Sequence, residues 1–251
     1  MEVHHHTHSG HGKKSWKTYF WEFLMLFLAV FCGFLAEYEL EHVIEHTREK
    51  EYIRSMLEDL GKDTANLSSV INNFQENENR LDNLMLRFDD GIKVFNNEWT
   101  KEFVLFALSG YEDFVYTDRT LQQLKNSGGL RLIRNKIAAA GIIGYDAAIR
   151  DLYGELKLLA EYQSKYDEII HKIWSFRQMY TDLGSIKLDR GKDIELKKNY
   201  WMSNNPKDYE YLFNKTMAYR DGFNRIRILM LAIKDEANSL ISVLKKEYRF
   251  D

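Results

Sequence analysis

The 251-residue sequence contains one cysteine and one proline, too few of either for disulfides or proline turns to organise the fold. Cys32 has no partner for an intrachain disulfide, which excludes a disulfide-built fold. Because proline is the main helix breaker, a chain whose only proline is Pro206 can hold long uninterrupted helices. The formal net charge of −3 lacks the positive excess that favours nucleic-acid binding, so no nucleic-acid partner is expected.

Motifs that carry catalytic or nucleotide-binding chemistry are also missing from the sequence. It contains no G-x-G-x-x-G, no P-loop, no nucleophile elbow and no C-x-x-C. We therefore expect a protein that is not an enzyme.

One long apolar run stands out near the N-terminus. Residues 19–36 read YFWEFLMLFLAVFCGFLA and carry a single charge, Glu22. As a helix the run is roughly 27 Å long, close to the hydrocarbon thickness of a bilayer. Aromatic residues gather at both ends, as they do at membrane interfaces. The run predicts a transmembrane helix over residues 19–37, with a buried core helix as the alternative.

The charges that flank this run predict its orientation. Lys13, Lys14 and Lys17 precede it, whereas the stretch that follows it contains more glutamate than Arg and Lys. Positive flanks remain in the cytoplasm, so we expect a cytoplasmic N-terminus and an extracytoplasmic C-terminal domain. The predicted parts are a His-rich cytoplasmic tail (1–18), the transmembrane helix (19–37), a charged neck helix (38–52) and a helical bundle (53–251).

Apolar residues recur every three or four positions along three later stretches, as in helices with one buried stripe. The first stripe contains Ile53, Leu57, Leu60, Thr64, Leu67, Ile71, Phe74, Glu78, Leu81, Met85 and Phe88. The second contains Ile149, Leu152, Leu156, Leu159, Gln163, Tyr166, Ile170, Ile173, Arg177 and Tyr180. The third contains Leu212, Thr216, Tyr219, Phe223, Ile226, Met230, Ile233, Ala237, Leu240 and Leu244. Their similar lengths predict an all-α fold, an elongated bundle or coiled coil of helices packed up and down.

Small residues lie on one face of the predicted transmembrane helix. Ala29, Gly33 and Ala36 follow the spacing that lets two membrane helices approach closely. We therefore expect a homo-oligomer, although the stripes themselves can close within one chain or between chains.

Histidines form two candidate metal sites. His4, His5, His6, His8 and His11 can bind a transition metal, the alternative being a disordered tail that binds metal adventitiously. His42, Glu45 and His46 match the H-x-x-E-H pattern of inverted zinc peptidases, in which two histidines hold zinc and the glutamate acts as base. The alternative is a solvated charged neck, which its many neighbouring charges favour.

Two further features allow a different function. Glu22 is an acid near the cytoplasmic end of the predicted span, where it can serve an ion-conducting or proton-coupled assembly or pair with Lys14 or Lys17. Aromatic residues of the C-terminal part can line a ligand cleft or simply form the core. They are Tyr111, Phe114, Tyr116, Tyr162, Tyr166, Trp174, Tyr180, Tyr200 and Trp201.

Two stretches resemble a family of uncharacterised single-span envelope proteins of Gram-negative bacteria. They are WEFLMLFLAVFCGFLAEYELEH with REKEYIRSMLEDL, and LQQLKNSGGLRLIRNK. The resemblance implies a bacterial inner-membrane protein with a periplasmic helical domain, and it transfers no catalytic residue. With the absent motifs and the long stripes, it predicts an oligomeric scaffold or accessory subunit that contacts the lipid bilayer and other envelope proteins.

Overall fold

The computed structural model describes residues 15–88, 100, 102, 103, 106, 110–183 and 200–250. The helices with defined bounds are α1 (Trp16–Leu86), α3 (Arg119–Asn126), the 3-10 helix η2 (Gly129–Leu132), α4 (Lys136–Ile173), α5 (Phe176–Leu183) and α6 (Pro206–Tyr248). Within the described residues the only β contact is an isolated bridge between Trp174 and Trp201. The prediction of an all-α protein is therefore confirmed.

The chain forms two compact units, Met1–Glu51 and Tyr52–Asp251, and α1 contributes to both. In the first unit, α1 contains the apolar run. The most apolar 18-residue window has a mean hydropathy of 2.0, and none of it is buried. Phe27 lies between Phe23 and Phe31, with ring centroids 6.2 and 5.9 Å away. The run is thus a candidate membrane-spanning helix by length and composition.

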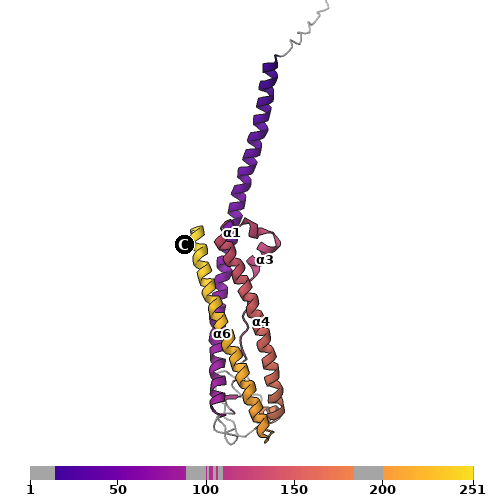
Figure 1. Ribbon diagram of the computed structural model, residues 1–251, viewed down its shortest axis with the longest axis vertical. Helices are drawn as coiled ribbons and strands as arrows, with labels where there is room; N and C mark the ends of the chain where they lie inside the picture. Colours follow the sequence, from indigo (N-terminus) through magenta and orange to yellow (C-terminus); the bar gives the residue numbers. More distant parts are fainter. Residues whose placement is uncertain are drawn as a thin grey trace, which may run out of the picture. The chain divides into compact units, whose positions relative to one another are not determined.

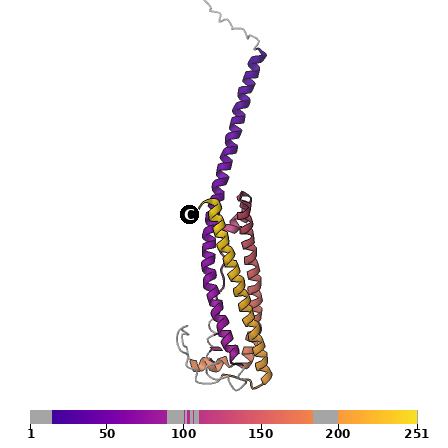
Figure 2. The ribbon, with the colours of Figure 1, turned by 60° about the vertical axis from the view of Figure 1, so that its left-hand side comes forward.

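In the second unit, residues 52–86 of α1 lie beside α4 and α6 and share one apolar core with them (Figures 1 and 2). The directions of the three helices differ from a simple up-and-down order. Figure 1 shows that α1 and α4 run the same way and α6 runs opposite to both. The chain returns along α1 through residues 110–118, which have no helical or strand structure.

The third predicted stripe is confirmed in full, because all ten of its residues are buried in α6. Local signals fix where this helix begins. The Asn205 side chain accepts a hydrogen bond from the Lys207 backbone N–H, and Pro206 occupies the first turn, where its missing N–H costs nothing.

In the second stripe, six of the eight residues from Ile149 to Ile173 are buried, and Leu156 and Gln163 are half-buried. The prediction for Arg177 and Tyr180 is wrong, because both are exposed and Met179 is buried instead. The reason is that α4 ends where Trp174 becomes extended and pairs with Trp201, which resets the register of α5. The start of α4 is set by Asn135, whose side chain accepts hydrogen bonds from the N–H groups of Ile137 and Ala138.

Glycines allow α4 and α6 to approach closely. A Cβ added at Gly141 would lie 2.7 Å from Leu240 Cδ1, and one at Gly222 would lie 2.7 Å from Leu159 Cδ1. Because Leu159 is fully buried, it has little room to move away. Both glycines therefore lie where α4 and α6 are in close contact.

Candidate functional site

A row of polar side chains on α1 holds residues 110–118, which have no helical or strand structure, and the first turn of α3. Asn77 Nδ2 donates to the Gly110 carbonyl at 3.1 Å, and Asn73 Oδ1 accepts from the Glu112 N–H at 2.9 Å. Farther along, Asn66 accepts from the Val115 N–H at 3.0 Å and Asp63 from the Thr117 N–H at 2.8 Å. The row ends at Asp59, which accepts from the backbone N–H of Thr120 at 3.0 Å. These side chains thus supply hydrogen-bond partners to backbone groups of residues 110–118, which lie outside helices and strands.

Asp63 is the most constrained acid in this row. Its second oxygen accepts a hydrogen bond from the Tyr145 hydroxyl at 3.0 Å, while the side chain is almost fully buried. Burial raises the pKa of the Asp63 carboxyl above its ordinary value, against the opposing effect of the hydrogen bonds from Thr117 and Tyr145. Burial also raises the pKa of Tyr145, helped by the nearby Asp63 charge.

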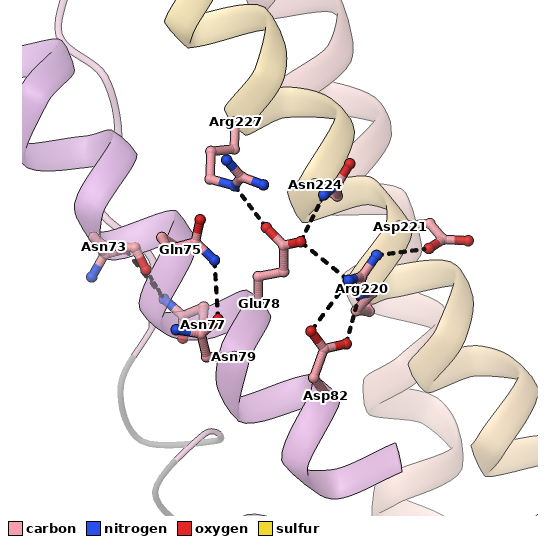
Figure 3. A network of polar contacts seen from close by, with 10 residues as sticks. All are labelled: Asn73, Gln75, Asn77, Glu78, Asn79, Asp82, Arg220, Asp221, Asn224 and Arg227. Atoms are coloured by element: carbon pink, nitrogen blue, oxygen red, sulfur yellow. Dashed lines mark hydrogen bonds and ion pairs between the residues drawn. The ribbon is translucent and has the colours of Figure 1, made fainter. Parts of the chain in front are cut away.

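A second polar network joins α1 to α6 (Figure 3). Glu78 accepts from Arg227 Nε at 2.7 Å and from Asn224 Nδ2 at 2.6 Å, and it lies 3.2 Å from Arg220 Nη2. Arg220 also binds Asp82 through Nε at 2.8 Å. Burial alone would raise the pKa of Glu78, but the hydrogen bonds and charges of its α6 partners lower it. The carboxylate is saturated by its own chain, so this network fixes register rather than offering a free reactive group.

A partly enclosed cavity of about 210 Å³ lies between the helices of the second unit. Its described lining is mainly aromatic, with four polar side chains among the rings. The lining residues are Asn77, Phe103, Phe106, Gly110, Tyr111, Gln163, Tyr166, Asp167, Ile170, His171, Phe176, Tyr219 and Phe223. Several of the rings meet edge to face: Phe106 lies 6.0 Å from Tyr166 and 5.9 Å from Tyr219 between centroids. The cavity therefore offers aromatic walls and one carboxylate.

The predicted aromatic residues fall in the core, in the wall of the cavity and at the surface. Phe114, Trp174 and Tyr200 are buried in the core, and Tyr180 is exposed. Tyr111 and Tyr166 line the cavity. The cavity also uses residues outside the predicted set, notably Asp167 and Tyr219.

The predicted metal-site residues fall in different places. His4, His5, His6, His8 and His11 lie outside the described residues. His42 packs edge-on against Tyr38, with ring centroids 4.3 Å apart. His46 Nδ1 lies 3.5 Å from the Glu49 carboxylate. No group of three or more His, Cys, Asp or Glu side chains in the described part of the chain is placed to hold a metal ion.

The remaining predicted residues all lie on the exposed part of α1. Ala29, Gly33 and Ala36 are exposed there, and nothing within 4 Å would meet a Cβ added at Gly33. Glu22 is exposed as well and lies in the same apolar run.

Sequence reasoning missed the buried polar row of α1. Thirteen residues from Ile53 to Leu84 are buried, and four of them are polar: Ile53, Met56, Asp59, Leu60, Asp63, Leu67, Val70, Ile71, Phe74, Asn77, Glu78, Leu81 and Leu84. Seven of the eleven residues of the first predicted stripe are among them, and the other four, Leu57, Thr64, Met85 and Phe88, are half-buried. Asp59, Asp63 and Asn77 were not predicted to be buried. Polar residues at heptad spacing can occupy buried positions, but the spacing alone does not identify the distant groups that make burial of Asp63 and Asn77 stable.

Comparisons with protein-family models, with curated proteins and with solved structures found no match to this chain.

Proposed function

We propose that this protein is a non-enzymatic, single-pass inner-membrane protein that self-associates and acts as a scaffold or accessory subunit of an envelope complex. The observation that carries the proposal is the exposure of the apolar run: none of its 18-residue window is buried. Apolar surface exposed on every side of a helix is costly in water and stable in lipid, where the helix satisfies its own backbone hydrogen bonds.

The charge distribution supports the proposed topology. Lys17 precedes the apolar run, whereas Glu37, Glu39 and Glu41 follow it directly. A cytoplasmic N-terminus and an extracytoplasmic, elongated helical bundle follow from the positive-inside rule. The resemblance to Gram-negative envelope proteins favours the periplasm as the compartment of that bundle.

Residues 52–250 support a structural role. The charged side chains of the Glu78 network bind one another and leave the helices fixed in register. A rigid helical unit presented beside a membrane is suited to holding partners in position. We propose that other envelope proteins are those partners.

Cys32 provides a direct test of self-association. It is the sole cysteine of the chain, it is exposed, and its helical position is next to the face formed by Ala29, Gly33 and Ala36. Oxidative cross-linking in native membranes should give a disulfide-linked dimer that Cys32→Ser abolishes. Gly33→Ile should weaken the cross-link by blocking close approach, whereas Phe31→Ile on the opposite side should leave it unchanged.

Two results would overturn this proposal. One is recovery of the full-length chain from cells as a soluble monomer. The other is a chain in membranes that cross-links neither to itself nor to any other protein.

A second candidate function rests on Glu22, an exposed carboxylate in the apolar run. Acids in membrane helices often serve ion or proton paths. Proton flux into vesicles that contain the purified protein tests this candidate. Glu22→Gln should abolish the flux if Glu22 carries protons, and should leave Cys32 cross-linking intact if the protein is only a scaffold.

A transition metal at His4, His5, His6, His8 and His11 remains a separate proposal. Equilibrium dialysis with Zn²⁺ or Ni²⁺ should detect bound metal that is lost when residues 1–12 are deleted. His42→Ala and His46→Ala are the matched variants for the neck. A loss of metal in those variants instead would move the site to the neck.

A further inference from the structure

The carboxylates inside the second unit differ in how their charge is neutralised. Asp59 binds Arg119 at 2.9 Å, Asp208 binds Lys172 at 2.8 Å, and Glu78 binds Arg227 at 2.7 Å. Asp146 binds Lys125 at 2.8 Å and also contacts Arg150. Each of these acids therefore has a Lys or Arg from its own chain.

In the described part of the second unit, Asp63 and Asp167 lack such a partner. Asp63 instead accepts hydrogen bonds from the Thr117 N–H and the Tyr145 hydroxyl. Asp167 is half-buried on α4 and lines the cavity, yet among the described residues it forms no ion pair with Lys or Arg. The titratable side chain that acts on it is His171, one turn away on the same helix. Burial raises the pKa of the Asp167 carboxyl, with His171 opposing that effect, which is the direction expected for an acid that lacks a strong cationic partner.

The walls of the cavity suit a cation as well. Tyr166 and Tyr219 lie 5.5 Å apart between ring centroids, and Tyr219 and Phe223 lie 5.0 Å apart. Aromatic faces attract ammonium groups, and several rings around one cavity form the cages that bind quaternary amines. The described lining contains no Lys or Arg that would repel such a ligand.

We propose that this cavity binds a small organic cation, an amine or quaternary ammonium whose charge is neutralised by Asp167 and whose substituents contact Tyr166, Tyr219 and Phe223. The volume of about 210 Å³ limits the ligand to a small molecule, because it is below the size of pockets that bury drug-sized ligands. The cation occupies the place that Lys and Arg side chains take at Asp59, Glu78, Asp146 and Asp208. This site is independent of membrane insertion and of self-association.

The test compares two ligands of nearly equal shape that differ in charge. Full-length protein in maltoside micelles is titrated calorimetrically with choline and with 3,3-dimethylbutan-1-ol, in which carbon replaces the ammonium nitrogen. Maltoside is chosen because it has no choline headgroup. Choline should bind saturably and about tenfold or more tightly than the neutral alcohol. Equal affinity for the two ligands, or no saturable binding of choline, would overturn the proposal.

Matched variants on α4 separate the site from a general charge effect. Asp167→Asn keeps the shape of the side chain and should weaken choline binding about tenfold or more. Glu168→Gln makes the same change of charge one residue away, at an exposed position outside the lining, and should leave affinity unchanged. If both variants weaken binding equally, choline is attracted only by net charge and the site is not where we place it.

A second cavity variant keeps the proposal testable if Asp167→Asn fails to fold. Phe176→Leu removes a ring from a half-buried lining residue and should weaken choline binding more than binding of the neutral alcohol. Unchanged choline affinity in this variant, with native thermal unfolding, would exclude the aromatic walls from the site. Phosphocholine, titrated in parallel, distinguishes two sources of the bound cation. Binding as tight as that of choline indicates a lipid headgroup, and weaker binding indicates a free amine.

Discussion

The two parts of α1 belong to one helix, yet their apolar side chains face opposite environments. Residues 19–36 are apolar on every side, and all but Leu24 are exposed. Residues 53–84 are apolar along one stripe, and that stripe is buried against α4 and α6. A helix that is apolar all round needs an apolar solvent, whereas a striped helix needs protein on one side only. The comparison shows that distribution of apolar residues, more than their number, decides what a helix packs against.

The largest expected difference is between truncating a buried phenylalanine in residues 53–84 and truncating an exposed one in residues 19–36. Phe74 is fully buried and lies 4.9 Å from the Phe223 ring, so Phe74→Ala should lower the free energy of unfolding by about 3–5 kcal/mol. Phe27 is exposed, so Phe27→Ala should change it by no more than about 0.5 kcal/mol. Urea unfolding in maltoside micelles, followed by tryptophan fluorescence, to which buried Trp174 contributes, measures both. Equal losses would mean that the apolar run belongs to the folded core.

The next largest effect on stability is expected at Glu78, a buried polar residue of α1. Glu78→Gln removes the negative charge between Arg220 and Arg227 and should cost about 2 kcal/mol, less than a fully broken buried pair because Arg220 keeps Asp82. Glu76→Gln is the control, since Glu76 is exposed on the same helix turn. The same urea titrations measure the difference. A Glu78→Gln variant as stable as the control would show that the network contributes no stability.

Glu78 and Asp63, two acids on α1, should contribute to stability with opposite dependence on pH. The pKa of Glu78 is lowered from 4.5, so its contribution is present above that value and is lost as pH falls through its folded-state pKa. The pKa of Asp63 is raised from 3.8, so the wild type gains stability relative to Asp63→Asn as pH falls from neutrality toward 3.8. Unfolding at several pH values measures the stability of the wild type relative to Glu78→Gln and to Asp63→Asn. If both stability differences change with pH in the same direction, the pKa of one of the two acids is not shifted as stated.

Glycines in the two parts should respond differently to an added methyl group. Gly222→Ala should lower stability by about 1 kcal/mol, because the clash with buried Leu159 exceeds the gain in helix propensity. Gly33→Ala meets open space and should leave unfolding of the second unit unchanged. It should nevertheless reduce cross-linking through Cys32 if this face joins two copies. Thermal unfolding and cross-linking yields measure the two effects.

The smallest expected effect concerns the start of α6. Asn205→Ala removes the capping bond to the Lys207 N–H and should cost about 0.5–1 kcal/mol. Asn204→Ala, at the exposed neighbouring position, is the matched control. If both changes have the same effect on thermal unfolding, the cap does not stabilise the helix.

How far the sequence predicts this fold depends on the range of the interactions. All ten residues of the α6 stripe and the Asn205-Pro206 start were predictable, because helical periodicity and capping act over a few residues. Asp63 and Asn77 were not, because their partners Thr117 and Gly110 lie 54 and 33 residues away. Hydrophobic patterns have no means of showing that a polar residue is buried when such distant groups satisfy it. The end of α4 at Ile173 depends in the same way on Trp201.

The sequence by itself determined that the chain is helical, where its apolar run lies and which residues of α6 face the core. These properties follow from backbone propensity and the period of apolar side chains, both of which are local. Only the tertiary structure decided which acids acquire a Lys or Arg and which, like Asp167, line a cavity without one. The physical reason is that charge pairing and cavity shape depend on groups brought together from distant parts of the chain, and no local pattern encodes their meeting.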